Sequence, residues 1–164
     1  MASPRTRILL ILAILISGLL AGGNIDRAFV AMPAWQHVGA LAWAEFSRHA
    51  DLGNGLILYP LESIGGALLT LAAAISFHFD RSAPRAAAVP LYAAVLLLAG
   101  GLLVTVQAAP IMLGIRDVRE PATLQHAFEG FWHWGNLRAA CQVLAFLAQL
   151  ATLALLWRSD RPIH

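Results

Sequence analysis

The chain of 164 residues is far richer in apolar side chains than a water-soluble domain. Hydrophobic residues make up 59% of it and charged residues 12%, against roughly 45–50% and about 25% in an ordinary soluble domain. So few charged side chains cannot cover a compact core in water. The composition therefore excludes a soluble globule and indicates an integral membrane protein.

The charge balance and the cysteine count exclude further classes. The chain holds 11 basic and 9 acidic residues, and every basic residue is an arginine. These arginines are scattered and form no basic stripe, so nucleic acid is not an expected partner. The single cysteine, Cys141, excludes an internal disulfide, a CxxC redox pair, a cysteine-held iron–sulfur cluster and a c-type haem.

Four apolar stretches predict four membrane-spanning helices, because a helix needs about 20 apolar residues to cross the hydrocarbon core. The expected spans, in a single domain of residues 1–164, are residues 8–25, 53–79, 88–110 and 137–157. The fold class is therefore all-α, an integral membrane four-helix bundle. The first stretch has an alternative: Arg5 and Arg7 precede it and the small residues 21–23 end it, as in a cleaved secretory signal.

The distribution of arginine predicts the orientation. Arginines are dense in the two terminal tails and in the short loop after the second span, and sparse in the two long loops. The dense set is Arg5, Arg7, Arg81, Arg85, Arg158 and Arg161. Because cytoplasmic segments are enriched in Arg and Lys, we expect both termini in the cytoplasm, with a bacterial inner membrane as the location and membrane lipid as a partner.

Two segments outside the spans are predicted to be helical. Residues 33–49 and 121–134 each open with proline and are rich in helix-forming residues. We expect them to cap the bundle or to lie at the membrane interface. Four tryptophans fall in these segments, either as an interfacial aromatic belt or as ligand contacts: Trp35, Trp43, Trp132 and Trp134.

A small set of polar residues is expected inside the bundle. Glu62 interrupts the second span and Arg138 begins the fourth; ionisable residues in spans are costly and mark functional sites. Gln142 and Gln149 follow Arg138 on one helical face, and Gln107 lies near the end of the third span. We expect a polar seam with Glu62 facing Arg138, either as a functional pair or as a structural ion pair.

Histidine and glutamate recur at helical spacing in the two outer segments. Glu45 and His49 are four residues apart, and His126, Glu129 and His133 fall on one face. Such spacings can bring ligands to a shared transition metal in helical bundles, which is the cofactor expected here if one is bound. The alternatives are the wet face of a solvated helix, or proton transfer and substrate hydrogen bonding without metal.

The entry to the fourth span carries a family resemblance. The segment Phe131-Trp132-His133-Trp134-Gly135-Asn136-Leu137-Arg138 runs directly into an apolar helix. It resembles the same point in anthrone oxygenase-like small integral membrane proteins, with the match resting on Trp132, Asn136 and Arg138. Four spans, the chain length and a long loop after the first span also match. The family is named by analogy with enzymes that oxidise anthrones to anthraquinones with oxygen, and most bacterial members have no established function.

The resemblance implies an oxidoreductase acting on a flat, apolar phenolic or quinone-like molecule. Arg138 and Asn136 would hold a carbonyl or phenolate, and His133 or Glu129 would remove the proton. The ring would stack on aromatic side chains, with Glu62 a further catalytic candidate; the stacking residues are Tyr59, Trp132 and Trp134. The alternative is a non-catalytic membrane module that binds lipid or quinone, or an accessory subunit of a larger membrane complex.

Overall fold

The computed structural model describes residues 3–159, and that part of the chain is almost entirely helical. Four long helices dominate it: α1 (Pro4–Asp26), α4 (Gly55–Phe79), α5 (Ala88–Gly114) and α6 (Pro121–Arg158). Each belongs to a helical segment that is long and apolar enough to cross a membrane. The all-α four-helix bundle predicted from the sequence is therefore confirmed, and the apolar lengths support a multi-pass membrane protein.

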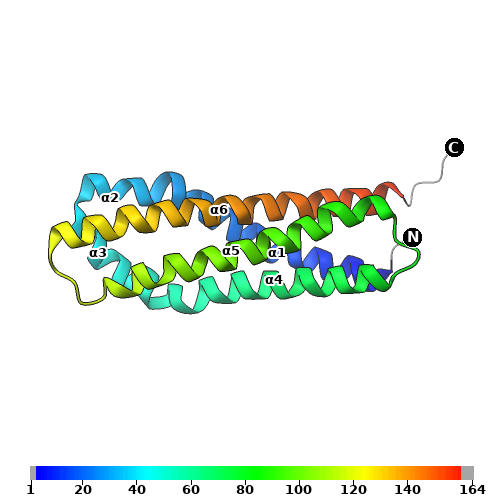
Figure 1. Ribbon diagram of the computed structural model, residues 1–164, viewed down its shortest axis with the longest axis horizontal. Helices are drawn as coiled ribbons and strands as arrows, with labels where there is room; N and C mark the ends of the chain where they lie inside the picture. The colour runs from blue at the N-terminus through cyan, green and yellow to red at the C-terminus, as the bar shows by residue number, and fades with distance from the viewer. Residues whose placement is uncertain (1–2, 160–164) are drawn as a thin grey trace.

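The four long helices form a closed ring. Helix α1 packs against α4 and α6, and α5 packs against the same two helices. Both ends of the described chain lie at one end of the bundle, together with the α4–α5 connection and its short helix η3 (Arg85–Ala87) (Figure 1). At this end, the hydroxyl of Thr6 near the start of α1 forms a hydrogen bond of 2.9 Å with the hydroxyl of Ser76 in α4.

The opposite end is an extension built from helices. Helix α6 has 38 residues, which at 1.5 Å per residue is about 57 Å, roughly twice the hydrocarbon thickness. Residues 121–134 are helical as expected, but they continue into the fourth span without a break. The helix begins sharply, because Pro121 occupies its first turn and the Glu120 side chain accepts hydrogen bonds from the backbone N–H groups of Ala122 and Thr123.

The segment between the first two spans is also helical. A π-helical turn, η1 (Arg27–Ala31), joins α1 to α2 (Met32–Val38). The segment η2 (Ala50–Asn54), which is kinked at the non-helical residue Gly53, joins α3 (Ala40–His49) to α4. The expected helix over 33–49 is split at Gly39, whose φ of 88° and ψ of 152° are open to glycine alone. The chain reverses there, so α2 and α3 pack beside the N-terminal half of α6, which contains Phe128 and Phe131.

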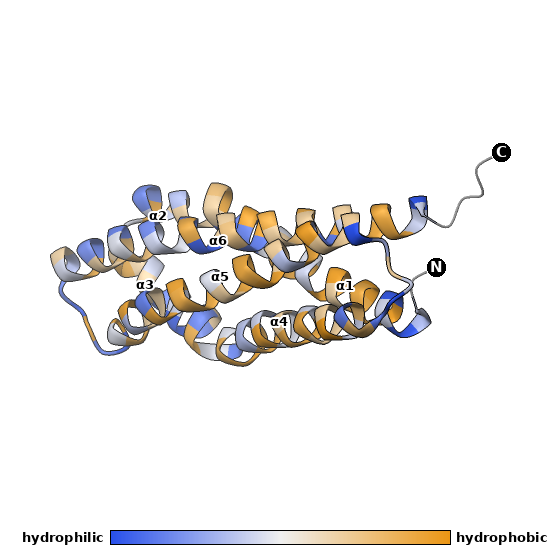
Figure 2. Cartoon of the chain, turned by 45° about the vertical axis from the view of Figure 1, so that its right-hand side comes forward, coloured by the Kyte–Doolittle hydropathy of each residue, from blue (hydrophilic) through white to orange (hydrophobic). Residues whose placement is uncertain are grey.

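Two apolar cores stabilise the two halves. The outer core includes Trp35 and Trp43, which are 6% and 7% exposed, and Phe128 and Phe131 of α6. The inner core joins α1, α4, α5 and α6 near the chain termini. The belt interpretation is wrong for Trp35 and Trp43, because both rings are buried. Apolar residues predominate in the middle of the bundle, and hydrophilic residues gather at its ends (Figure 2).

Polar residues link α1 to α6 and α4 inside the bundle. The amide of Asn24 donates to Gln142 at 2.6 Å, and the amide of Gln149 donates to Ser17 at 3.1 Å and to Thr70 at 2.8 Å. Bonds of this kind fix the register of packed membrane helices. The polar seam predicted on α6 is confirmed for Gln142 and Gln149, which are buried. Gln107 is exposed and does not belong to it.

We expect Gly39→Ala to destabilise the outer half of the bundle. A Cβ at this position forces an alanine into backbone angles that cost about 1–3 kcal/mol. Gly22→Ala is the matched control, because Gly22 lies in α1 with open space around its position. The measurement is the unfolding free energy in mixed detergent micelles. Equal stabilities of the two variants would contradict the assigned role of Gly39.

Candidate functional site

The centre of the site is an ion pair between the π-helical turn η1 and the kinked segment η2. Nη2 of Arg27 donates to Oδ2 of Asp51 at 2.8 Å, and Nη1 donates to Oδ1 of the same carboxylate. The two side chains are 17% and 7% exposed. A π-helical turn shifts the side chains that follow it and is frequent at functional sites. Here η1 and η2 bring together residues that are 24 positions apart in the chain.

The ion pair expected from the sequence does not form. Glu62 and Arg138 both line one cavity, but within residues 3–159 the carboxylate of Glu62 has no ion pair with Arg138. Asp51 is the acidic residue whose field acts on the Arg138 guanidinium. The carboxylate that pairs with an arginine here is Asp51 of η2, just before α4, and its partner is Arg27.

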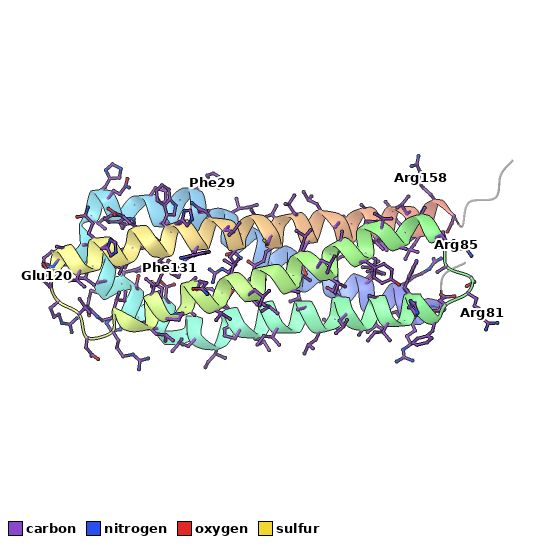
Figure 3. The ribbon with its side chains drawn as sticks, viewed as in Figure 1. Phe29, Arg81, Arg85, Glu120, Phe131 and Arg158 are labelled. Carbon is purple, nitrogen blue, oxygen red and sulfur yellow. The ribbon has the colours of Figure 1, made fainter. Side chains whose placement is uncertain are left out.

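Aromatic rings flank the two guanidinium groups. The guanidinium carbon of Arg27 is 5.1 Å from the centre of the Phe131 ring and 5.9 Å from that of Tyr59. The guanidinium carbon of Arg138 is 5.9 Å from the Phe131 ring. Phe131 belongs to the N-terminal half of α6, and its ring lies on the side facing α5 (Figure 3). The electron-rich faces of the rings attract the two guanidinium cations. This attraction holds both arginines toward the bundle interior.

Arg138 has no polar partner in the described part of the chain. Its Nε is buried without a hydrogen bond, and its guanidinium contacts a ring rather than a carboxylate. Arg27 is neutralised by Asp51. The cluster of Arg27, Asp51 and Arg138 therefore keeps one positive charge, that of Arg138. An uncompensated buried cation is costly. The arrangement can therefore stabilise an oxygen anion placed beside Arg138.

Two cavities meet at this cluster. The larger one, of about 330 Å³, lies between α4 and α5; the smaller one, of about 250 Å³, lies between α1, α3 and α4. Five residues line both: Arg27, Asp51, Tyr59, Ser63 and Arg138. The rest of the larger cavity is mainly apolar, with Leu102, Ala109 and Met112 on the α5 side. α4 and α5 make the least extensive contact of the neighbouring pairs in the ring.

Gly55 allows Tyr59 to face the cavities. A Cβ on Gly55 would lie 2.7 Å from Cε2 of Tyr59 and 2.9 Å from the carbonyl oxygen of Ala50. Both distances are too short for any side chain, so only glycine lets the Tyr59 ring fold against the first turn of α4. The ring then fills the gap between Arg27 and the lining of the larger cavity.

The remaining predicted substrate-binding residues divide into two groups. Trp132 and Asn136 line a small space of about 10 Å³ that also contacts Arg27 and Arg138. Trp134 packs against the outer core instead and lines none of the cavities around the cluster. Of the predicted catalytic residues, Glu129 and His133 lie exposed on α6 and line none of these cavities either.

The histidine and glutamate residues considered as metal ligands form no group of three or more in residues 3–159. His49 Nε2 is 3.1 Å from Glu45, which also accepts from Arg48 at 2.9 Å, and both ends of this pair are exposed. Glu129 accepts from Gln125 at 3.1 Å, while His126 and His133 are exposed. Residues 3–159 contain no group of three or more His, Cys, Asp or Glu side chains that could hold a metal ion.

Sequence reasoning missed Arg27, Asp51 and Phe131. Arg27 and Asp51 each lie at the edge of a long connection, where charged residues usually face water. An available signal was their position, one directly after the first span and the other directly before the second. Comparison of this chain with protein-family models, curated proteins and solved structures yields no match.

We expect Asp51→Asn to destabilise the protein strongly, because it leaves Arg27 buried without a counter-ion. Breaking one side of a buried ion pair costs about 3–5 kcal/mol. Asp26→Asn is the matched control, since Asp26 is the exposed carboxylate next to Arg27. The double variant Arg27→Met/Asp51→Leu should recover most of the loss. Mixed-micelle unfolding checks all three, and a loss for Asp51→Asn no larger than for Asp26→Asn would contradict the assignment.

Proposed function

We propose that this protein binds a flat, apolar phenolic or quinone-like molecule within the membrane, with an oxygen of the ligand beside Arg138. The observation that supports this function is the guanidinium of Arg138, which has no polar partner in the described chain and lines an otherwise mainly apolar cavity. Ligand sites combine an apolar lining with a few polar groups that orient the ligand. The Arg138 cation supplies the orienting group here.

The size and lining of the larger cavity suit a small ring system. Its volume of about 330 Å³ is at the lower end of the roughly 300–1,000 Å³ of small-molecule sites. Tyr59 and Phe131 line it beside the charged cluster. Aromatic side chains favour offset or edge contacts with planar rings, so the ligand ring would lie against them while its oxygen meets Arg138.

The ligand reaches this cavity from the lipid phase. Leu56, Ile64 and Leu113 line the cavity and are 43%, 49% and 48% exposed on the outside of the bundle. The cavity therefore extends to the apolar surface between α4 and α5. A molecule that dissolves in the hydrocarbon core enters there without crossing a charged surface.

The site would lie near the outer leaflet of a bacterial inner membrane. Arg81, Arg85 and Arg158 lie at the same end as both chain ends (Figure 3), and Arg-rich ends favour the cytoplasm. Arg161 lies outside the described residues. Counted back from Trp157, the 19 residues of 139–157 extend about 28 Å. This nearly spans the hydrocarbon core and places Arg138 at its far boundary.

A second candidate is oxidation of an anthrone held beside Arg138, where the larger and the smaller cavity meet. The net change is anthrone plus O₂ to anthraquinone plus water, with oxygen as the oxidant. Arg138 would stabilise the enolate that forms when a ring-carbon proton leaves. Glu62 is favoured over Glu129 and His133 as the proton acceptor, because Glu62 shares a cavity with Arg138 and the other two are exposed on α6.

We expect Thr105→Phe to weaken ligand binding by occupying part of the larger cavity. Thr105 lines that cavity, and its hydroxyl donates only to the carbonyl of Gly101 in its own helix. Val106→Phe is the matched control, because the neighbouring Val106 is 65% exposed on the lipid side. Binding of 1,4-naphthoquinone and anthrone to protein in nanodiscs, measured calorimetrically, should weaken about tenfold or more for Thr105→Phe alone. Absence of binding to the unmodified protein overturns the proposal.

The oxidation candidate has a separate test. Oxygen uptake with anthrone should fall at least about tenfold for Glu62→Gln, whereas His133→Ala and Glu129→Ala should leave the rate unchanged. An oxygen electrode and the absorbance of anthraquinone report the reaction. Binding of anthrone with no uptake above the protein-free rate would eliminate this candidate and leave the binding function intact.

A further inference from the structure

We propose that the ligand of the larger cavity is bound as its oxygen anion, with Arg138 as its counter-ion. This inference rests on the proposed function and narrows its ligand class to acidic phenols, hydroxyquinones and enolisable ketones. A neutral quinone would contact the same lining but would leave Arg138 without a negative partner.

The charges around the larger cavity decide the sign of the ligand. Arg27 of η1 and Asp51 of η2 neutralise each other through two hydrogen bonds. α4 contributes the ionisable Tyr59, and α5 contributes no ionisable side chain to the lining. From α6, Arg138 is the one ionisable residue that lines the cavity. The described residues that line the larger cavity therefore carry a net charge of one positive unit.

The remaining carboxylates near Arg138 lie on the other side of the cluster. Glu62 and Asp26 line the smaller cavity and do not line the larger one. Neither forms an ion pair with Arg138 within residues 3–159. The described lining of the larger cavity therefore holds no unpaired carboxylate that would offset the charge of Arg138.

The apolar lining strengthens this preference. A nearby opposite charge favours the ionised form of an acid, and the effect increases where water is excluded. A phenol that is mostly neutral in the bilayer would therefore lose its proton to water as it settles against Arg138. Because the ring must stay in the apolar part, the ligand requires an acidic oxygen at the edge of a planar ring.

The test uses 4-nitro-1-naphthol, a flat phenol whose ionised form absorbs visible light. In nanodiscs containing the protein, the pH midpoint of its ionisation should fall by about one unit or more relative to empty nanodiscs. Arg138→Gln should remove this shift, and Arg138→Lys should keep it because the cation remains. Arg119→Gln is the matched control, since Arg119 is exposed and remote from the cavity lining.

A neutral analogue separates this inference from the proposed function. The methyl ether of the same naphthol should bind the unmodified protein about tenfold more weakly than the naphthol. This comparison does not depend on how well an Arg138 variant folds. Equal binding of the two compounds with no change in midpoint overturns the anion inference and leaves quinone binding in place. Binding of neither compound, nor of naphthoquinone, overturns both.

An aliphatic acid tests whether a ring is needed. Decanoate offers the same kind of oxygen anion on a flexible chain, and lipid-derived acids are abundant in membranes. We expect decanoate to leave the bound naphtholate in place at equal concentration. Displacement of the naphtholate by decanoate would overturn the assignment to aromatic ligands.

Discussion

The ion pair between Arg27 and Asp51 is the interaction on which the outer half of the molecule depends. It joins the turn that ends α1 to the turn that begins α4, and it is nearly closed to solvent. Two charges transferred from water need nearly ideal geometry to recover their hydration. The bidentate contact and the ring faces of Tyr59 and Phe131 supply that geometry. Both residues of the pair lie where the backbone departs from α-helical winding, Arg27 in η1 and Asp51 in η2.

Once Arg27 is neutralised, the charge of Arg138 determines the chemistry of the site. A cation at this position would be tolerated in a polar cleft, but here it lines a mainly apolar cavity and rests on a ring. Cation–π contact recovers only about 1–2 kcal/mol, less than the cost of burying a charge. The cavity beside the guanidinium is therefore the place where an anion would complete the charge balance.

The sequence was sufficient for the four-helix bundle. The four spans, the helical outer segments and the buried glutamines follow from apolar length and helical periodicity, which depend on local residue order. Arg138 was singled out as a charge at the start of a span, and Tyr59 through the family resemblance. The cluster itself does not follow from local residue order. Arg27 meets Asp51, 24 positions away, through the π-helical turn η1, the reversal at Gly39 and the kinked segment η2. No periodicity encodes such turns. The buried Trp35 and Trp43 likewise depend on α6 extending far beyond the membrane thickness.

The absence of the Glu62–Arg138 pair in the described chain changes what the site can do. If the two side chains were paired, both charges would be satisfied and the bundle would hold a structural ion pair with no demand for a ligand. Glu62 lines the α1-side cavity and Arg138 lines both cavities, so one residue remains a potential proton acceptor and the other a potential oxyanion partner. A shared wall of Tyr59 and Ser63 between the two cavities would keep acid–base chemistry and anion stabilisation within reach of one ligand without allowing the two groups to neutralise each other.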